Sequence, residues 1–451
     1  MMGGMASEET RTAKSPTVRS SATPPDGEPL VPATRAWAVR LVVVGIVLSA
    51  LNLRPAITSL GALLEEVRDG LGMSGSVAGL LTSVPPLCFA VFGVMAPRLA
   101  RRFGAGAVVC AGMVAITAGL LIRPYTGSTA GFLAASALTL MGIAVSNVLM
   151  PVIVKRWFPD RVGSMTGLYS MALALGTSAA AAVTVPMTEA LGGSWQSGLA
   201  VWAGLAAAAV VPWIPLVRDR GPVSTEPKAA RSVHTRVEGA GPVRHVHARV
   251  KPPAPPALRI TRSRTAWALA VFFGLQATAA YITMGWMAQI FRDAGVSAGT
   301  AGLLLAVTMV MGVPLAFVIP RVATRLPHQG PIVIALGVCG LAGYAGLYLA
   351  PAAGAWAWAV LLGVSNCAFP LALTMVGMRA RTGAGVAQLS AFAQSTGYLI
   401  SIPGPLLVGV LYQHSGGWGL PIALMIGLMV PQMAVGVLAG RDRTVEDEAA
   451  R

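Results

Sequence analysis

Twelve long apolar stretches follow one another along this chain of 451 residues. A helix needs about 20 mostly apolar residues to cross a bilayer, whereas a membrane β-strand alternates over about 10 residues. The pattern therefore predicts an all-α integral membrane protein and excludes an ordinary soluble enzyme. Composition agrees, since charged residues make up 11% of the chain and soluble proteins have about 25%. The predicted spans are residues 38–64, 75–97, 105–123, 128–154, 162–187, 195–217, 265–291, 298–320, 330–350, 355–378, 384–411 and 418–440.

Lysine and arginine are unevenly distributed between the connections of these spans. Of the 32 that flank the spans, 29 lie in the two tails, the central loop and every second short loop. Because cationic loops stay in the cytoplasm, both termini and the central loop are predicted to be cytoplasmic in a multi-pass plasma-membrane protein. The net charge of +16 is then a consequence of topology, and no nucleic-acid partner is expected.

The chain is built from two similar halves. Several short segments of the first half recur in the same order in the second half, 219 to 223 residues later. Six spans followed by six, joined by a cytoplasmic loop, is the plan of parallel-repeat transporters, whose substrate site lies at the midplane between the halves. We therefore predict a major facilitator fold of 12 transmembrane helices in two pseudo-symmetric six-helix bundles. The matched segments are Gly72–Ser74 with Gly295–Ser297, Ala78–Leu81 with Ala301–Leu304, Pro97–Arg102 with Pro320–Arg325, and Val145–Pro151 with Val364–Pro370.

The regions outside the two bundles differ from them in composition. The first 36 residues are polar and lack the apolar core of a cleavable signal, and the central loop is rich in proline and arginine, as flexible linkers are. The predicted domains are a disordered cytoplasmic tail (1–36), an N-terminal bundle (37–217), a cytoplasmic linker (218–264), a C-terminal bundle (265–440) and a cytoplasmic tail (441–451).

Arg54 stands out because, cysteine and tyrosine aside, it is the only ionisable residue predicted to lie deep in a span. An arginine at the bilayer centre costs at least about 2.5–3.5 kcal/mol and calls for a function or a partner. Pro55 removes a backbone hydrogen bond at this point, so we expect a kink. With no carboxylate predicted at the same depth, Arg54 is either an anion receptor or a pin that bonds backbone carbonyls and amides between helices.

Uncharged polar residues on the first, fourth, seventh, tenth and eleventh spans are candidates to complete a substrate site. In membranes such residues also join helices, for about 0.6 kcal/mol each, so a binding role and a packing role both stay open. The candidate substrate-binding residues are Arg54, Asn52, Thr58, Gln276, Tyr281, Gln394, Tyr398, Asn147 and Asn366.

Motifs for other classes of function are missing from the sequence. There is no phosphate-binding glycine loop for ATP, no catalytic Ser/His/Asp set, and no spacing of cysteine or histidine that suggests a metal. We therefore expect neither an enzyme nor a cofactor.

Several segments of the membrane region carry a specific pattern of residues. They are Asn52–Ser59, Ala78–Pro85, Ala96–Gly104, Asn147–Pro151, Val154–Arg161, Met165–Tyr169, Phe273–Gln276 with Tyr281 and Trp286, and Gly404–Gly409. Together they resemble the cyanate permease and 2-nitroimidazole transporter family of the major facilitator superfamily. The resemblance covers most of the membrane region and leaves out the tails and the central loop. It implies a secondary transporter of small anions or small polar heterocycles.

The loop after the second span departs from the broader superfamily pattern. Where that pattern has an aspartate and a second glycine, this chain has Pro97 and Ala100, so an aspartate-centred ion pair is not expected here. Glu65 is either a gate or proton acceptor or a solvated residue at the outer rim. The candidates for gating or coupling are Glu65, Arg98, Arg102, Arg321 and Arg325.

We therefore predict a transporter, functional as a monomer in the lipid bilayer, that moves a small anion or polar heterocycle by alternating access. Protons are the expected coupling partner, if any. A drug or metabolite exporter of the same fold is the main alternative. A membrane sensor or scaffold is a third hypothesis, which the lack of a folded output domain disfavours.

Overall fold

The computed structural model describes residues 33–218 and 260–449, so the expectations for the first 32 residues and for most of the central linker lie outside the described residues. The described part contains twelve helical segments long and apolar enough to cross a membrane, as predicted. The helices of the first half are α1 (Ala33–Asn52), α2 (Pro55–Ala62), α3 (Leu64–Leu71), α4 (Gly75–Phe103), α5 (Ala105–Ile122), α6 (Thr129–Trp157), α7 (Val162–Ala190), α8 (Trp195–Ala200) and α9 (Trp202–Val210), with 3-10 turns at η1 (Arg123–Tyr125), η2 (Pro159–Arg161) and η3 (Val211–Arg218).

The second half begins with the 3-10 turn η4 (Ile260–Arg262) and continues to the end of the described chain. Its helices are α10 (Arg264–Asp293), α11 (Ala298–Val310), α12 (Gly312–Ala323), α13 (Gly330–Leu349), α14 (Ala355–Asn366), α15 (Ala368–Met378), α16 (Gly383–Ser401), α17 (Pro403–Ser415), α18 (Gly419–Ala439) and α19 (Val445–Ala449).

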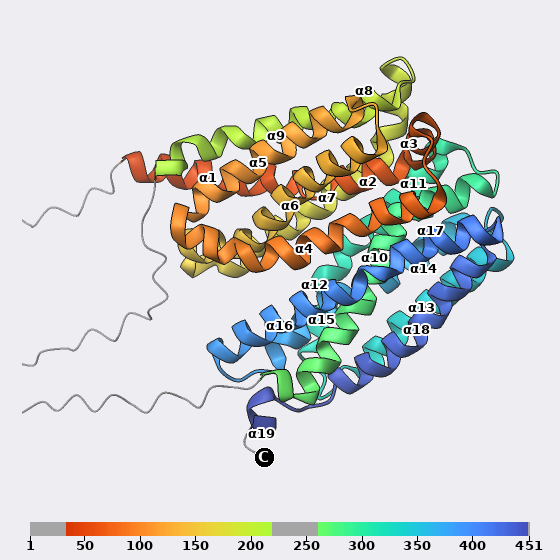
Figure 1. Ribbon diagram of the computed structural model, residues 1–451. Helices are drawn as coiled ribbons and strands as arrows, with labels where there is room; N and C mark the ends of the chain where they lie inside the picture. Colours follow the sequence, from red (N-terminus) through yellow and green to blue (C-terminus); the bar gives the residue numbers. More distant parts are fainter. Residues whose placement is uncertain (1–32, 219–259, 450–451) are drawn as a thin grey trace, which may run out of the picture.

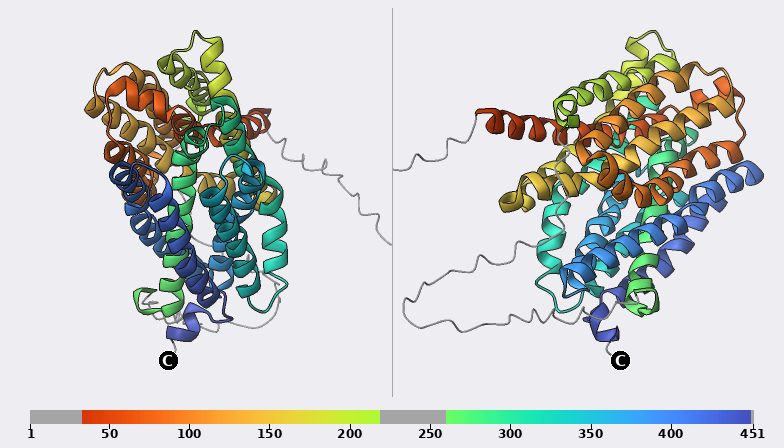
Figure 2. Two further views of the ribbon diagram at one scale, coloured as in Figure 1. Left: turned by 90° about the vertical axis from the view of Figure 1, so that its right-hand side faces the viewer. Right: turned by 60° about the vertical axis from the view of Figure 1, so that its left-hand side comes forward.

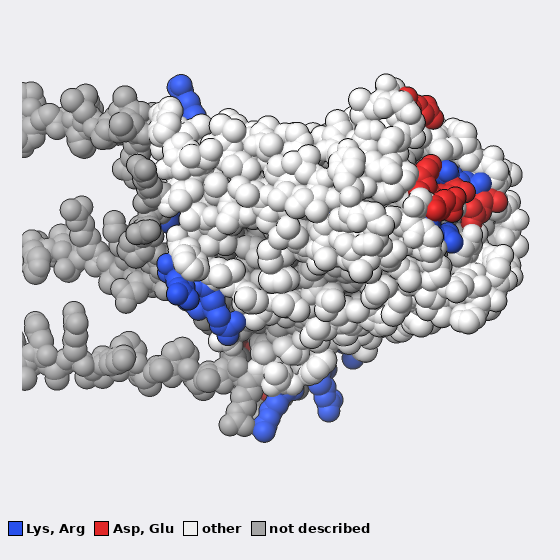
Figure 3. Space-filling model, turned by 45° about the horizontal axis from the view of Figure 1, so that its top comes forward, with Lys and Arg blue, Asp and Glu red and all other residues white. Residues whose placement is uncertain are grey.

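The two halves form two helix bundles that lie side by side (Figures 1 and 2). We call the end at which α1 begins and α19 lies the linker end, and the end that carries α3 the far end. The bundles are close together at the far end and diverge toward the linker end (Figure 1). On the face shown in Figure 3, lysine and arginine gather at the linker end, acidic residues gather with a few basic ones at the far end, and the surface between the two ends carries almost no charge. Such a band suits contact with lipid.

The sequence repeats mark equivalent structural features in the two bundles. Gly72 and Gly295 have φ of +61° and +88°, which glycine adopts without strain, and each follows a helix end. The side chains of Ser74 and Ser297 cap the next helices, α4 and α11, by accepting hydrogen bonds from backbone N–H groups. The repeats therefore set the same turn and helix start in both halves.

The repeated Ala-Gly-Leu-Leu segments lie where the two bundles meet. A Cβ atom at Gly79 on α4 would be 2.8 Å from the carbonyl oxygen of Leu406 on α17. A Cβ atom at Gly302 on α11 would be 2.6 Å from the carbonyl oxygen of Ala181 on α7. Only glycine permits such close helix packing, so each half supplies one glycine contact to the interface between the bundles.

Several transmembrane segments are interrupted, and the first interruption is the predicted one. α1 ends at Asn52 and α2 begins at Pro55, which confirms the kink expected from Pro55. Further breaks separate α11 from α12, α14 from α15, and α16 from α17. Interrupted helices in transporters expose backbone groups where a cavity or a partner can use them.

The C-terminal helix α19 packs under the linker end of the C-terminal bundle. Glu446 accepts hydrogen bonds from the backbone N–H groups of Arg381 and Thr382, each 3.1 Å long, at the start of α16. Glu448 accepts hydrogen bonds from the hydroxyls of Ser263, at 2.6 Å, and Thr265, at 2.7 Å, at the start of α10. The two carboxylates therefore hold the beginnings of two helices together.

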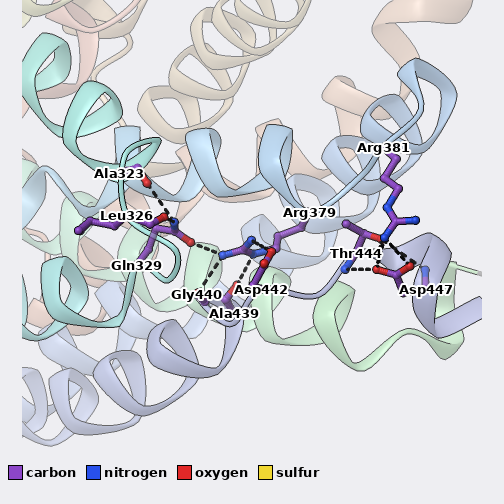
Figure 4. A network of polar contacts seen from close by, with 10 residues as sticks. All are labelled: Ala323, Leu326, Gln329, Arg379, Arg381, Ala439, Gly440, Asp442, Thr444 and Asp447. Carbon is purple, nitrogen blue, oxygen red and sulfur yellow. Dashed lines mark hydrogen bonds and ion pairs between the residues drawn. The ribbon is translucent and has the colours of Figure 1, made fainter.

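Beside α19, a buried arginine ties the ends of α15 and α18 together (Figure 4). The Arg379 guanidinium donates to the carbonyl oxygens of Ala439, at 3.0 Å, and Gly440, at 2.8 Å, and to the side chain of Gln329. Arg381 forms an ion pair with Asp447 at 2.8 Å. These contacts fix the linker end of the C-terminal bundle as one unit.

We expect acid to release α19. Partial burial raises the pKa of the Glu446 and Glu448 carboxyls, but the hydrogen bonds that they accept outweigh it, so both pKa values lie below the ordinary value. A lowered carboxyl pKa stabilises the folded state above the ordinary pKa of about 4.3, and this contribution is lost as the pH falls through the lowered value. The melting temperature of a Glu446→Gln/Glu448→Gln variant should lie below the wild-type value at pH 7 and approach it at about pH 3, where the lowered carboxyls become protonated. An equal gap at both pH values would contradict this expectation, and Glu189→Gln, at an exposed far-end position, is the control.

Candidate functional site

Arg54 lies between the two bundles, at the break between α1 and α2. Its neighbours Leu53 and Pro55 are buried, whereas its own side chain keeps part of its surface accessible. Among the described residues Arg54 forms no ion pair with an aspartate or glutamate. A guanidinium stays protonated in proteins, so a full positive charge without a counter-ion lies at the centre of the molecule.

Aromatic side chains from both bundles surround this guanidinium. Its carbon atom is 5.8 Å from the centre of the Phe89 ring on α4, a cation–π distance. The hydroxyls of Tyr169 on α7, Tyr281 on α10 and Tyr398 on α16 lie close enough to interact with it electrostatically. Because α10 and α16 belong to the other bundle, the surroundings of Arg54 are assembled from both halves.

Tyr398 connects the two bundles through its ring. The ring stacks on Phe89 at 5.1 Å with an interplanar angle of 26°, and meets Phe273 edge-on at 5.2 Å. A flat aromatic surface beside a guanidinium suits a planar solute, because the solute can stack on the ring while its acceptor atoms meet the N–H donors of Arg54.

The hydroxyls near Arg54 differ in their hydrogen bonding. Tyr169 donates to the side-chain oxygen of Asn147, within the N-terminal bundle. The buried Tyr281 hydroxyl instead lies within reach of the Arg54 guanidinium itself, from the other bundle. Tyr281 and Tyr169 therefore approach Arg54 from the two halves, and only Tyr169 is held by a side chain of its own bundle.

Gln276 lies in a network that joins three helices of the C-terminal bundle. Its side-chain NH₂ donates to the backbone and side-chain oxygens of Asn366, at 3.0 and 2.9 Å. Its side-chain oxygen accepts from Gln432 on α18 at 3.0 Å. The amide of Gln276 is thus fully engaged within its own bundle, as in the packing role that the sequence left open.

The remaining predicted binding residues are dispersed. Asn52 donates to the carbonyl oxygens of Leu48, at 2.8 Å, and Leu205, at 3.0 Å, so it links α1 to α9 and is not brought to Arg54. The Thr58 hydroxyl is buried and donates to the backbone oxygen of Arg54 at 3.1 Å. Gln394 is half-buried on α16 and donates to Ser390 on the same helix at 2.7 Å, which leaves its side-chain oxygen available.

Two glutamines on the C-terminal bundle should therefore respond differently to truncation. Gln276→Ala leaves Asn366 and Gln432 without their partner, and an unmade buried hydrogen bond costs about 1–3 kcal/mol. We expect Gln276→Ala to lower the melting temperature of the purified protein by several degrees. Gln394→Ala breaks one hydrogen bond within its own helix and should raise the KM of transport with little change in melting temperature. If Gln394→Ala lowers the melting temperature and Gln276→Ala raises only the KM, then Gln394 is the packing residue and Gln276 contacts the solute.

The predicted gating residues fall into two groups. At the far end, Glu65 and Glu66 of the N-terminal bundle form ion pairs with Arg292 of α10, at 2.8 and 3.0 Å. At the linker end, the four arginines Arg98, Arg102, Arg321 and Arg325 are exposed and form no ion pair with the described residues. The structure thus places Glu65 in a contact between the bundles and gives the four arginines no contact of that kind.

Further contacts between the bundles gather at the far end. Gln413 on α17 accepts hydrogen bonds from the backbone and side chain of Ser76, at 2.8 and 2.7 Å. The Trp286 indole donates to the Thr82 hydroxyl at 3.2 Å. Together with Glu65, Glu66 and Arg292, these contacts hold the far end closed.

Arg123 is a deep cation that sequence analysis missed. It lies in η1 at the end of the third span and was counted among the loop cations, yet only 2% of its surface is exposed. The connections at the far end carry three lysines or arginines in all, Arg68, Arg123 and Arg292. That scarcity is the signal that could have singled it out, because a cation on the side predicted to be non-cytoplasmic is unusual.

The chain belongs to the major facilitator superfamily, whose family model matches residues 42–402. It is 34% identical to an uncharacterized transporter, YycB, of Bacillus subtilis (strain 168), over 90% of this chain and 94% of the relative. It is 30% identical to the 2-nitroimidazole transporter of Escherichia coli (strain K12), over 90% and 96% of the two chains. It is 29% identical to the cyanate transport protein CynX of the same strain, over 85% and 94%.

Solved structures show the same fold. The nucleoside transporter NupG superposes with a TM-score of 0.68 at 14% identity, over 89% of this chain and 98% of that one. The fold predicted from the repeats is thereby confirmed. The protein is a multi-pass membrane transporter of small molecules, and its family is one of transporters rather than enzymes.

Proposed function

We propose that this transporter moves a small anion or a small polar heterocycle across the plasma membrane by alternating access, with Arg54 as the receptor for the negative or electron-rich end of the solute. The observation that carries the proposal is an arginine between the bundles, partly accessible, without a protein carboxylate and ringed by aromatic residues of both halves. A guanidinium in that setting is a fork of donors for a planar acceptor.

The relatives support this class of solute. One relative is named for 2-nitroimidazole, a planar heterocycle, and another for cyanate, a small linear anion. Both names describe solutes that carry electron-rich acceptor atoms and no positive charge. An exporter of lipophilic cations is disfavoured, because such a solute would be repelled by Arg54.

The closed far end indicates which side the site faces. We place the linker end and both termini in the cytoplasm, from the distribution of lysine and arginine. The contacts of Glu65 and Glu66 with Arg292 then close the outer side, and the divergence of the bundles at the linker end corresponds to an inward-facing state (Figure 1). Rocking of the bundles would break these ion pairs and expose Arg54 to the outside.

Coupling to protons has few candidate carriers. Among the described residues no carboxylate pairs with Arg54, so a proton that accompanies transport is carried by the solute or by Glu65. The surroundings of Arg54 and the far-end contacts between the bundles lie within one chain, so we propose that a monomer is sufficient for transport.

The test is uptake by proteoliposomes that contain the purified protein. Labelled cyanate, a 2-nitroimidazole and a small aromatic carboxylate would be offered with and without an inward proton gradient, beside protein-free liposomes and a lipophilic cation. Uptake of an anion or heterocycle supports the proposal, and its response to the gradient decides proton coupling. Uptake of the cation alone would replace the proposal with drug export.

A further inference from the structure

A small cavity of about 20 Å³ lies between Arg54 and the far end. Residues of α2, α4, α6 and α10 line it together with η1, so both bundles contribute to its wall. The lining is mostly apolar, with polar side chains only from Thr82, Arg123, Ser136 and Tyr281. A cavity of this size has room for a water molecule or a small ion, and not for a large ligand.

Two of those four polar side chains have atoms without a hydrogen-bond partner. The buried Nε and Nη2 of Arg123 and the hydroxyl of Ser136 are unpartnered in the described chain. Ser136 and Arg123 are 1% and 2% exposed. Native proteins leave few such atoms unsatisfied, and a buried charge without a counter-ion is especially costly, so their convergence on one cavity needs a cause.

The geometry of Arg123 indicates the missing partner. Its Nη1 donates to the carbonyl oxygen of Ala56 at 3.1 Å, and its guanidinium lies 5.9 Å from the centre of the Phe132 ring. These two contacts hold the group in place and leave the Nε and Nη2 atoms, which together form one edge of the planar fork. That edge matches a pair of acceptor oxygens on a carboxylate-like anion.

We propose that this cavity is a second anion site, in which the Nε–Nη2 edge of Arg123 binds a small carboxylate or oxoanion. The hydroxyls of Ser136 and Tyr281 complete its shell. This inference rests on the proposed function, because it gives the same class of transported solute a second binding site between Arg54 and the far end.

The cavity lies between Arg54 and the closed far end, where a solute would pass on its way to or from Arg54. Gly61 and Gly285 line the cavity, and a Cβ atom at Gly61 would lie 2.0 Å from the carbonyl oxygen of Met284, so the bundles touch directly at its wall. Tyr281 belongs both to the cavity lining and to the surroundings of Arg54. The anion held by Arg123 is therefore next to the closed outer gate, one step away from Arg54.

The test separates the two sites by removing the first. Purified Arg54→Gln protein in detergent, in a gluconate buffer, is titrated with formate and with nitrate while its melting temperature is followed. We expect an anion-dependent rise that persists without Arg54. In the double variant Arg54→Gln/Ser136→Ala, the apparent affinity for the anion should be about tenfold weaker, because a hydrogen bond to a charged group is lost. Arg123→Gln should abolish the rise.

A matched serine provides the control. Ser146 lies on the same helix α6, is buried and is also unpartnered, but does not line the cavity. Ser146→Ala should leave the titration in the Arg54→Gln background unchanged. The comparison of Ser146→Ala with Ser136→Ala shows whether the anion binds in the cavity, even if Arg123→Gln fails to fold. No anion-dependent rise in Arg54→Gln, or equal titrations for the two serine variants, would overturn the second site. Full transport by Arg54→Gln would overturn the proposed function instead, while this titration would still report on Arg123.

Discussion

Replacing Arg54 by glutamine will strongly reduce saturable uptake while the protein still folds. Hydrogen bonds to a charged group contribute about 1.5–3 kcal/mol, and 1.4 kcal/mol is a factor of ten, so kcat/KM should fall by at least about tenfold. Arg54→Lys keeps the charge but loses the planar fork, and we expect it to be impaired nearly as much. Initial rates of uptake by proteoliposomes, over a range of solute concentrations, measure both effects.

Arg40→Gln is the matched control for this experiment. Arg40 lies on the same helix α1, near the linker end, and is exposed. Its replacement removes an arginine from the protein without touching the centre, so uptake should stay at the wild-type rate. If Arg54→Gln transports as fast as Arg40→Gln, Arg54 is a packing residue and the proposed receptor is wrong.

A leucine at Gly409 should hold the far end open. A Cβ atom at Gly409 on α17 would lie 2.3 Å from the carbonyl oxygen of Gly75 and 2.8 Å from the Cα atom of Gly79, both in α4. These are backbone atoms that cannot rotate away, so a side chain has to push the bundles apart. Overpacking costs about 1–3 kcal/mol, which is enough to shift a two-state equilibrium by about fivefold to a hundredfold. We expect Gly409→Leu to lose most of its transport.

The accompanying measurement reports the direction of the shift. A cysteine placed at Ser136, which is buried beside the cavity, should react faster with a membrane-impermeant maleimide applied from outside when Gly409→Leu is present. Gly427→Leu is the control, because Gly427 lies on the exposed side of α18 and a Cβ atom there meets nothing within 4 Å. Equal transport and equal labelling in the two leucine variants would show that the α4–α17 contact is not a gate.

Local signals in the sequence were sufficient for the architecture. Span length and composition predicted the twelve transmembrane segments, and Pro55 predicted the break that sets Arg54 between α1 and α2. The repeats anticipated equivalent helix starts at Ser74 and Ser297. Each of these features depends on residues close together in the chain, which is why it can be read without the fold.

Side-chain partnerships between distant helices could not be predicted in the same way. Nothing near Gln276 in the sequence indicates that it meets Gln432, 156 residues away, and that contact is what makes it resemble a packing residue. Asn52 shares its span with Arg54, yet it turns toward α9. A polar residue on a predicted span indicates only that a partner exists, and the rotation of the helix decides which one.

Arg123 illustrates the limit most clearly. Its position at the end of a span suggested an aqueous loop, because the boundary of a hydrophobic stretch is where charged residues normally meet water. Only the fold shows that η1 brings the side chain beneath α2 to the Ala56 carbonyl, where 2% of the residue is exposed. In the described part of the chain, two arginines without a carboxylate partner thus lie where both bundles contribute residues, Arg54 at the centre and Arg123 at the cavity toward the far end.

Equilibrium binding of the transported solute to the purified protein tests the central claim most directly. Calorimetric titrations of wild type, Arg54→Gln and Arg40→Gln in detergent would compare dissociation constants without any contribution from coupling or turnover. If Arg54 is the receptor, the solute should bind Arg54→Gln at least about tenfold more weakly than wild type and should bind Arg40→Gln with the wild-type Kd. A wild-type Kd in a folded Arg54→Gln protein would contradict it and place the solute elsewhere between the bundles.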